Sequence, residues 1–534
     1  MDSDDTRRRR SALACNTCRG RRTKCGGQRP QCSYCAEHGK ECFYPEQQDP
    51  PPSPLRTELS KLWGQLSHIT AIVQGQSQSP IALKKSSDHH PSLGFPYMTL
   101  QSTAFMKLLD LDPALPIYLE HLERRGRQPG VIHQPLPEGM IVAIDLDDAS
   151  VLLHAFTEQI HPWYPVLHPE FGEDFLQAVT ACFPASIPSC MTLLVLAIGC
   201  NVINRPDVTY IQAAMEMLPC VFADCSPRGV QCLLLFAIYH LCDARPCQAH
   251  DFVAMASYKL HTYIMNELDT DDNPRSIVGN CFWAALLIES EIRVQFSLVD
   301  SGIWNIIQFA PPLTTAATSW SYNPAYFVAE IAMRKMLQRC TWATSILAQN
   351  QFAYAPIVAA ELERQLDEWL QLLPESLSFF IFVHGNGDYS KRQRLLSHES
   401  PQVKFLRTQY YAFKASVYWP AVYEFLTTGQ KVTGDLLVPC VRFFASYVEF
   451  VSSAAAAVAV CRPNLWTLCT SVFTISMAAL VAAAEPCLRE VVPSGVHRSL
   501  ELAVSVLDEV MEVSASLAEM GAILRERVRR DIEE

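Results

Sequence analysis

The sequence of 534 residues predicts a small cysteine-rich N-terminal domain, a short coiled coil and a large, mostly α-helical domain. Three observations predict this order: six cysteines between residues 15 and 42, a heptad rhythm between 55 and 73, and long apolar segments beyond 104. The expected parts are the cysteine-rich domain, a proline-rich linker, the coiled coil, a disordered linker and the helical domain. Their boundaries are 1–48, 49–54, 55–73, 74–103 and 104–534.

The cysteines of the first domain form two copies of the spacing C-x2-C-x6-C. The first copy is Cys15, Cys18 and Cys25, and the second is Cys32, Cys35 and Cys42. A structural zinc ion takes four thiolate or imidazole ligands. One ion would leave two cysteines over, and two separate ions would need more ligands than the six cysteines and His38 supply. Two zinc ions that share two thiolates remove the deficit, and the equivalent first members, Cys15 and Cys32, are the expected bridges.

A disulfide knot or a redox pair is the alternative reading of these cysteines. Disulfide frameworks belong to secreted chains, and no apolar segment follows the arginines at 7–10 to make a signal peptide. The other fourteen cysteines are scattered from Cys182 to Cys487, mostly in apolar segments. They are expected to be small buried side chains in a reducing compartment. Cys242 and Cys247 could form a metal or redox pair, but their spacing favours core or loop positions.

Basic residues concentrate in the cysteine-rich segment. Residues 7 to 44 hold ten Lys or Arg against two acids, whereas the whole chain has a net charge of −12. A basic patch on an acidic protein is typical of nucleic-acid binding, because lysine and arginine neutralise phosphates and arginine can bond guanine O6 and N7. The expected DNA contacts are Arg7, Arg8, Arg9, Arg10, Arg19, Arg21, Arg22 and Lys24. A solvated charged helix face or a nuclear-localisation patch is the alternative, and residues 7–10 can serve import as well.

Residues 15–42 resemble the fungal binuclear zinc cluster, Zn₂Cys₆, a module that places a helix at the DNA major groove. The resemblance rests on the six cysteines, the basic run RGRRTK between Cys18 and Cys25, and Pro30 in the connecting loop. It implies two zinc ions held by the six thiols, a nuclear protein, and double-stranded DNA as the partner. It also implies that Arg21 and Arg22 face a CGG-type triplet.

The next segment predicts a spacer and a dimerisation element. Five prolines in residues 45–54 predict a stiff, extended linker. Apolar residues then recur at steps of 4, 3, 4, 3 and 4, which is a coiled-coil seam. The seam consists of Leu55, Leu59, Leu62, Leu66, Ile69 and Val73. A homodimer is expected, as in the family that the cluster resembles; an amphipathic helix packed on the main domain is the alternative.

The region from 104 to 534 is predicted to be helical because its apolar segments are long and lack strand alternation. Such segments are 190–203, 230–242, 279–299 and 503–528. Four stretches resemble the middle homology region of fungal binuclear-cluster factors: 156–175, 252–268, 281–292 and 409–423. Residues 464–484 carry no charge and are long enough to cross a membrane. Their serines and threonines favour a buried core helix instead, and no membrane contact is expected.

These observations together predict a zinc-dependent, sequence-specific RNA polymerase II transcription factor, and no enzyme. The sequence holds no P-loop, GxGxxG, HExxH or GxSxG motif. The resemblance favours an activator of a biosynthetic (secondary metabolite) gene cluster or a catabolic pathway, which would meet the transcription machinery or co-regulators. Residues 501–534 carry nine acids among apolar residues, and are either an activation segment or an ordinary amphipathic helix. The alternative function is a ligand-responsive repressor whose helical domain is a receptor for a small-molecule effector.

Overall fold

The computed structural model divides the chain into two compact units, Met1–Lys85 and Ser86–Glu534. The described residues are 14–44, 100, 102–125, 142–168, 170–205, 207–266, 275–293, 296, 298–313, 324–348, 354–379, 399–428 and 436–533. The predicted coiled coil, the proline-rich linker and the arginines at 7–10 lie outside the described residues. Of the linker predicted at 74–103, the structure describes residues 100, 102 and 103, where Leu100 is buried and Ser102 caps the helix Thr103–Leu108. Their boundaries and roles therefore remain predictions.

The first unit contains two short helices, α1 (Asn16–Gly20) and α2 (Ser33–Glu37). Each begins directly after the first cysteine of its triplet and contains the second. The buried centre of this unit consists of four cysteine side chains, at positions 15, 18, 32 and 35. Four thiols are not an adequate hydrophobic core, so a segment of this size needs metal binding to supply its folding free energy.

The described residues of the second unit form helices and the turns and loops that connect them. Its first helices are α4 (Thr103–Leu108), α5 (Leu115–Arg125), α6 (Leu146–Gln159), α7 (Phe171–Thr180), α8 (Ile187–Val202), α9 (Thr209–Glu216), α10 (Leu218–Ala223), α11 (Pro227–Cys242), α12 (Pro246–Asn266) and α13 (Arg275–Ile292). The later ones are α14 (Ala325–Ala348), α15 (Pro356–Gln371), α17 (Pro401–Thr428), α18 (Leu437–Val458), α19 (Leu465–Ala484), α20 (Gly495–Glu509) and α21 (Ala515–Glu533). Short 3₁₀ turns are η2 (Ile303–Phe309), η3 (Glu375–Leu377), η5 (Arg462–Asn464) and η6 (Arg489–Val491). The predicted fold class is confirmed.

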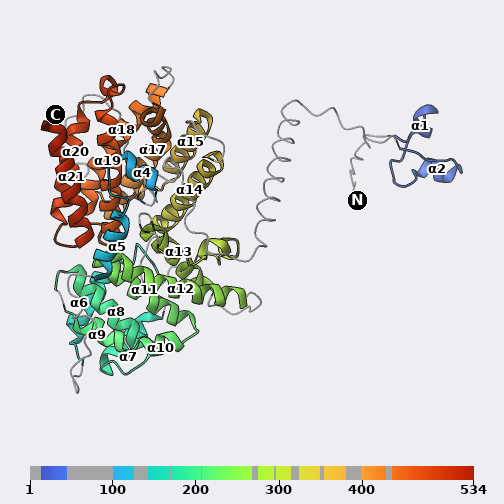
Figure 1. Ribbon diagram of the computed structural model, residues 1–534. Helices are drawn as coiled ribbons and strands as arrows, with labels where there is room; N and C mark the ends of the chain where they lie inside the picture. Colours follow the sequence, from blue (N-terminus) through green and yellow to red (C-terminus); the bar gives the residue numbers. More distant parts are fainter. Residues whose placement is uncertain are drawn as a thin grey trace. The chain divides into compact units, whose positions relative to one another are not determined.

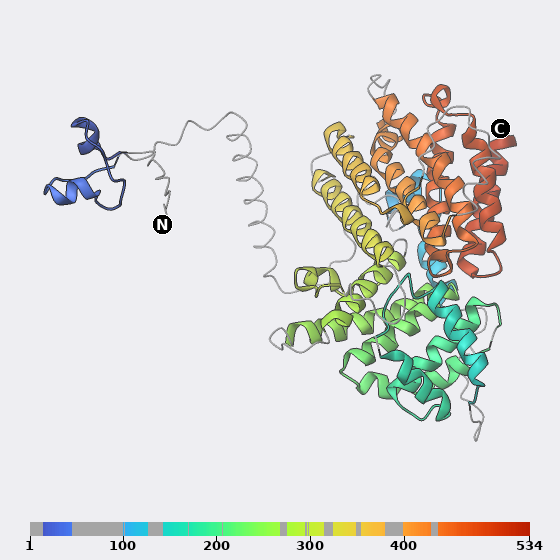
Figure 2. The same cartoon turned by 180° about the vertical axis from the view of Figure 1, so that it is seen from behind.

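The helices of the second unit gather into two ends. Helices α6 to α12 form one end and α17 to α21 the other, in both views of the ribbon (Figure 1, Figure 2). The early helix α4 lies among the C-terminal helices in these views, although it precedes them by some 300 residues. Helix α5 packs on both α12 and α21, so it joins the two ends.

Helices α8 and α11 correspond to two of the apolar segments, 190–203 and 230–242. Both are buried almost along their whole length and pack on each other. Each begins at a serine N-cap whose hydroxyl accepts a backbone N–H, from Ser189 to Ser186 at 3.3 Å and from Arg228 to Ser226 at 3.2 Å. Helices of this kind need partners on every side.

One close approach fixes how α6 meets α8. Gly199 lies in α8 directly against the backbone of α6. A Cβ atom at this position would lie 2.4 Å from the carbonyl oxygen of Leu152. Only glycine allows the two helix backbones to come this close.

Two described helices are long and apolar enough to cross a membrane by length and composition, α18 and the segment Arg462–Ala484 that contains α19. In the second, 89% of the most apolar window is buried inside the protein. The hydroxyls of Thr470 and Thr474 donate to the carbonyls of Thr467 and Thr470, each at 2.9 Å, so these buried polar groups are satisfied within the helix. The segment is a core helix of this unit, as predicted.

The scattered cysteines are mostly core residues. Ten of the fourteen beyond the first unit are buried, and Cys242 and Cys247 are among them. Within the part of the chain that the structure describes, no further group of His, Cys, Asp or Glu side chains is arranged to hold a metal ion. The prediction of core positions for this pair is confirmed.

Candidate metal centre and nucleic-acid interface

Four thiols of the first unit lie at the spacing of a tetrahedral zinc site. The sulfur atoms of Cys15 and Cys32 are 3.8 Å apart, and those of Cys18 and Cys35 are 3.9 Å apart. The cross pairs, Cys15 with Cys35 and Cys18 with Cys32, measure 3.8 and 3.7 Å. A zinc–sulfur bond of about 2.3 Å gives a tetrahedron whose edge is about 3.8 Å. The four sulfurs therefore match zinc in both chemistry and spacing.

The two cysteine triplets have the same local structure. The backbone N–H of Cys18 donates to the sulfur of Cys15 and that of Cys35 to the sulfur of Cys32, both at 3.4 Å. The third members repeat as well: the N–H of Cys15 donates to the sulfur of Cys25 at 3.4 Å, and that of Cys32 to the sulfur of Cys42 at 3.3 Å. The repeat in sequence is thus a repeat in structure, with an offset of 17 residues.

These N–H groups favour thiolate, which is the form of cysteine that binds metal. The N–H of Cys35 lowers the pKa of the Cys32 thiol to about 6, and the N–H of Cys18 lowers the pKa of Cys15. Burial instead raises the pKa of Cys18 to about 12. The backbone N–H groups therefore favour the thiolate form of the two equivalent first members, Cys15 and Cys32, which the sequence singles out as bridges.

The two halves differ at the second residue after the end of each short helix. In the first half the N–H of Thr23 donates to the carbonyl of Cys18 at 3.1 Å, and in the second Lys40 donates to Cys35 at 2.9 Å. Both bonds close a helix end that requires a left-handed residue one position earlier. In the second half that residue is Gly39, with φ of 59°. In the first half it is Arg22, with φ of 54°.

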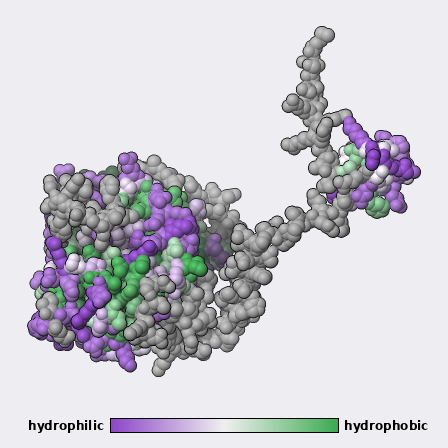
Figure 3. Space-filling model, turned by 90° about the horizontal axis from the view of Figure 1, so that it is seen from above, coloured by the Kyte–Doolittle hydropathy of each residue, from purple (hydrophilic) through white to green (hydrophobic). Residues whose placement is uncertain are grey.

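An arginine in this conformation costs free energy that glycine would not. Strained backbone conformations cluster at functional sites, so the left-handed backbone makes Arg22 a candidate functional residue. Arg22 is exposed, as are Arg21 and Lys24, and none of the three has a carboxylate partner among the described residues. The visible surface of this unit is mostly hydrophilic (Figure 3).

The structure places the predicted DNA contacts on a helix and the turn after it. Arg19 belongs to α1, whereas Arg21, Arg22 and Lys24 follow its end at Gly20. The basic run is therefore only partly helical. The arginines at 7–10 lie outside the described residues.

The sequence reasoning missed the tail that follows the last cysteine. The hydroxyl of Tyr44 donates to the carbonyl of Gln28 at 2.8 Å and lies 3.9 Å from the sulfur of Cys25. The guanidinium of Arg29 lies over the Tyr44 ring, 5.0 Å from its centre. The carbonyl of Phe43 accepts the N–H of Asn16 at 2.7 Å. This tail connects the two halves, and only its aromatic pair directly after Cys42 could have signalled it.

A compact cysteine module with exposed basic residues, joined to a large helical region, is the organisation of a zinc-dependent DNA-binding regulator. The family profile described as "Fungal Zn(2)-Cys(6) binuclear cluster domain" matches residues 13–51. The chain is 32% identical to "Putative transcription factor ecdB" of Aspergillus rugulosus over 98% of both chains. It belongs to the fungal Zn(2)-Cys(6) transcription factors, whose cluster domain binds two zinc ions.

Other relatives match shorter parts. An uncharacterised transcriptional regulatory protein of Schizosaccharomyces pombe is 22% identical over 52% of this chain and 37% of its own. "Transcription factor FBD3" of Gibberella moniliformis is 55% identical over 38 residues, which are 7% of this chain and 5% of its own. No solved structure matches. The likeness to many regulators is thus confined to a short segment, whereas the relative from A. rugulosus resembles the whole chain.

Proposed function

We propose that this protein is a nuclear activator that binds CGG-containing double-stranded DNA as a zinc-loaded homodimer. Its regulated genes belong to a biosynthetic (secondary metabolite) cluster or a catabolic pathway, and it carries no enzymatic activity. The observation that carries the proposal is the exposed, left-handed Arg22 beside four thiols at zinc spacing. The relatives reported above are named as regulators of transcription, which supports the general class.

The zinc ligands follow from the repeat. We assign two ions to the six thiols, with Cys15 and Cys32 shared between them. Each of these sulfurs lies within 3.8 Å of a thiol from the opposite half, which is what a shared ligand requires. His38 is not needed, because its ring stacks on Tyr34 and its Nδ1 lies 3.0 Å from the Tyr34 carbonyl.

The base-reading role falls to Arg21 and Arg22, and the phosphate role to Arg19, Lys24 and the arginines at 7–10. A planar guanidinium can make two parallel bonds to guanine, whereas lysine makes a point contact. Dimerisation through Leu55, Leu59, Leu62, Leu66, Ile69 and Val73 would set the separation of the two half-sites.

The activating role rests on the family and not on the C-terminal acids. The described part of this segment, 501–533, comprises the end of α20, a turn at 510–514 and α21, and its apolar residues Leu507, Leu517 and Leu524 are buried. This segment is an ordinary packed pair of helices. A reporter gene with CGG sites would distinguish activation from repression by its rise or fall when the protein is expressed.

The experiment that tests DNA reading uses two substitutions at one position. Arg22→Ala should weaken binding of the full-length, zinc-loaded protein to a CGG duplex by about 1–3 kcal/mol, and binding to scrambled DNA by less. Arg22→Gly should weaken DNA binding equally while leaving the fold intact or more stable, since glycine suits the left-handed backbone. Fluorescence anisotropy measures the affinities, and zinc retention against a chelator measures the fold.

Lys40→Ala is the matched control, because it removes an exposed positive charge from the second half of the repeat. It should reduce binding to both duplexes slightly and equally. If the Arg22 variants lose the same affinity for both duplexes, Arg22 contacts phosphate and does not read bases.

A further inference from the structure

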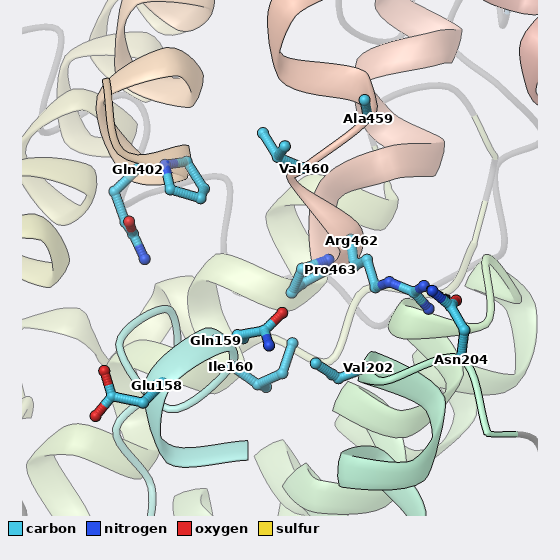
Figure 4. Close-up of a pocket in the computed structure, with 11 residues that line it drawn as sticks. Glu158, Gln159, Ile160, Val202, Asn204, Gln402, Ala459, Val460, Arg462 and Pro463 are labelled. Atoms are coloured by element: carbon cyan, nitrogen blue, oxygen red, sulfur yellow. Dashed lines mark hydrogen bonds between the residues drawn. The ribbon is translucent and has the colours of Figure 1, made fainter. Parts of the chain in front are cut away.

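A cavity of about 500 Å³ lies where the two ends of the helical unit meet. Four separate segments line it: the end of α6, the end of α8 with the turn after it, the start of α17, and the connection from α18 to α19 (Figure 4). Its volume falls in the range of small-molecule sites, about 300–1,000 Å³.

The cavity lining combines apolar and polar groups. Ile160, Val202 and Pro463 are buried side chains that give it apolar walls. Gln159 and Gln402 add two side-chain amides, and neither amide hydrogen-bonds to another described residue. Glu158 extends away from the other labelled side chains in Figure 4. A few polar groups among apolar walls are typical of a ligand site.

Arg462 is the cationic residue of this lining. Its Nη1 donates to the carbonyl and Oδ1 of Asn201 at 2.8 and 2.7 Å, and its Nη2 donates to Oδ1 of Asn204. All of these acceptors are neutral. These bonds use three of the five guanidinium donors and leave two for a ligand.

The charge of Arg462 has no carboxylate at ion-pair distance among the described residues. Arg462 interacts with Asp243 only through longer-range electrostatic attraction, because the Asp243 carboxylate is paired with Nε of Arg245 at 2.6 Å. A partly buried cation is expensive unless an anion compensates it. The start of α17, a helix of 28 residues, adds its partial positive charge at Pro401.

We propose that this cavity binds a small organic acid. The carboxylate pairs with the two remaining donors of Arg462, a charge-assisted contact with directional preference. Hydroxyl, carbonyl or amide groups of the ligand meet Gln159 and Gln402. Its apolar body packs on Ile160 and Val202.

A ligand bound in this cavity would affect how the two ends of the helical unit are arranged relative to each other. The hydroxyl of Tyr164 donates to Oδ1 of Asn464 at 3.1 Å, and Arg462 ties the connection before α19 to the end of α8. A ligand that fits one arrangement better than another shifts the population toward it. This inference rests on the proposed function: if the first unit binds DNA as a transcription factor, the helical unit is the part that can regulate it, and the acid is the effector.

The test uses full-length, zinc-loaded protein and a panel of hydroxy acids, 2-oxo acids and N-acetylated amino acids, each with its methyl ester. Thermal shift and calorimetric titration should find at least one acid that binds, with its ester weaker by about tenfold or more. Arg462→Gln should lower the affinity for the acid by a similar factor and leave the affinity for the ester unchanged.

Because Arg462 also holds α8, a second variant leaves it in place. Ala459 is exposed and lines the cavity, so Ala459→Trp fills the space without replacing a core residue. It should abolish binding, whereas Val438→Trp, at an exposed position in the helix α18 that precedes Ala459, should not. Binding that survives Ala459→Trp, or a panel in which no acid binds, overturns the site. Binding to a CGG duplex, measured on the same samples, reports separately on the proposed function.

Discussion

The contact between α6 and α8 yields the most direct test of the helical unit. Gly199→Ala adds one methyl group 2.4 Å from the Leu152 carbonyl oxygen and 3.0 Å from its carbonyl carbon. An ordinary contact is longer by about 1 Å, so the two helix backbones must separate by that amount. Overpacking of this kind costs about 1–3 kcal/mol. In a helix interior without neighbours the same change would stabilise by about 1 kcal/mol, so the sign of the effect reports the contact.

Urea unfolding of the full-length protein, followed by far-ultraviolet circular dichroism, measures this change. We expect a lower midpoint for Gly199→Ala. Gly495→Ala is the control, because its Cβ would meet the Val448 side chain at 3.6 Å, an ordinary contact. It should leave the midpoint unchanged or raise it slightly. A Gly199→Ala protein as stable as the parent would refute the close approach of α6 and α8.

Three further predictions concern the metal, the dimer and pH. Elemental analysis should give two zinc ions per chain, and chelation should unfold the first unit; one zinc, or an intact fold after chelation, would contradict this. Charged residues in place of Leu62 and Leu66 should lower the affinity for a paired CGG site toward that for a single site, without loss of zinc. Burial raises the pKa of Glu330 from 4.5 to about 7. The folded protein therefore keeps a proton that the unfolded chain releases, so stability should fall as pH rises between these values, and Glu330→Gln should abolish that fall.

Zinc binding by the first unit was predictable because its ligands lie close together in the sequence. Zinc ligation needs cysteines at fixed short spacings, and those spacings survive folding almost unchanged. The sequence could not show the left-handed backbone at Arg22, since the glycine of RGRRTK is Gly20 and arginine does not favour this conformation. It also could not show that Tyr44 returns to the sulfur of Cys25, because that contact depends on the path of a loop.

The helical unit was predictable as helices but not as an arrangement. Apolar segments such as 190–203 and 230–242 predict that a helix is buried, but they do not identify the helices that pack on it. Residues 503–528, one continuous pattern in sequence, fold into parts of two helices, α20 and α21, which meet at a turn. The cavity beside Arg462 combines four distant segments, and contacts across such sequence separations leave no local signal.

The internal repeat separates scaffold from function within the cluster. An offset of 17 residues superimposes the cysteines, the short helices and the left-handed residues of the two halves. The same offset pairs the basic residues with uncharged or acidic ones: Arg19 with Ala36, Arg21 with His38, Arg22 with Gly39 and Lys24 with Glu41. Zinc chemistry explains what the halves share, since both supply thiolates to the same pair of ions. It does not explain the charge difference, because ligation makes no demand on these four positions. A polyanion that meets only the first half does explain it, and so the asymmetry supports an orientation in which α1, and not α2, faces DNA.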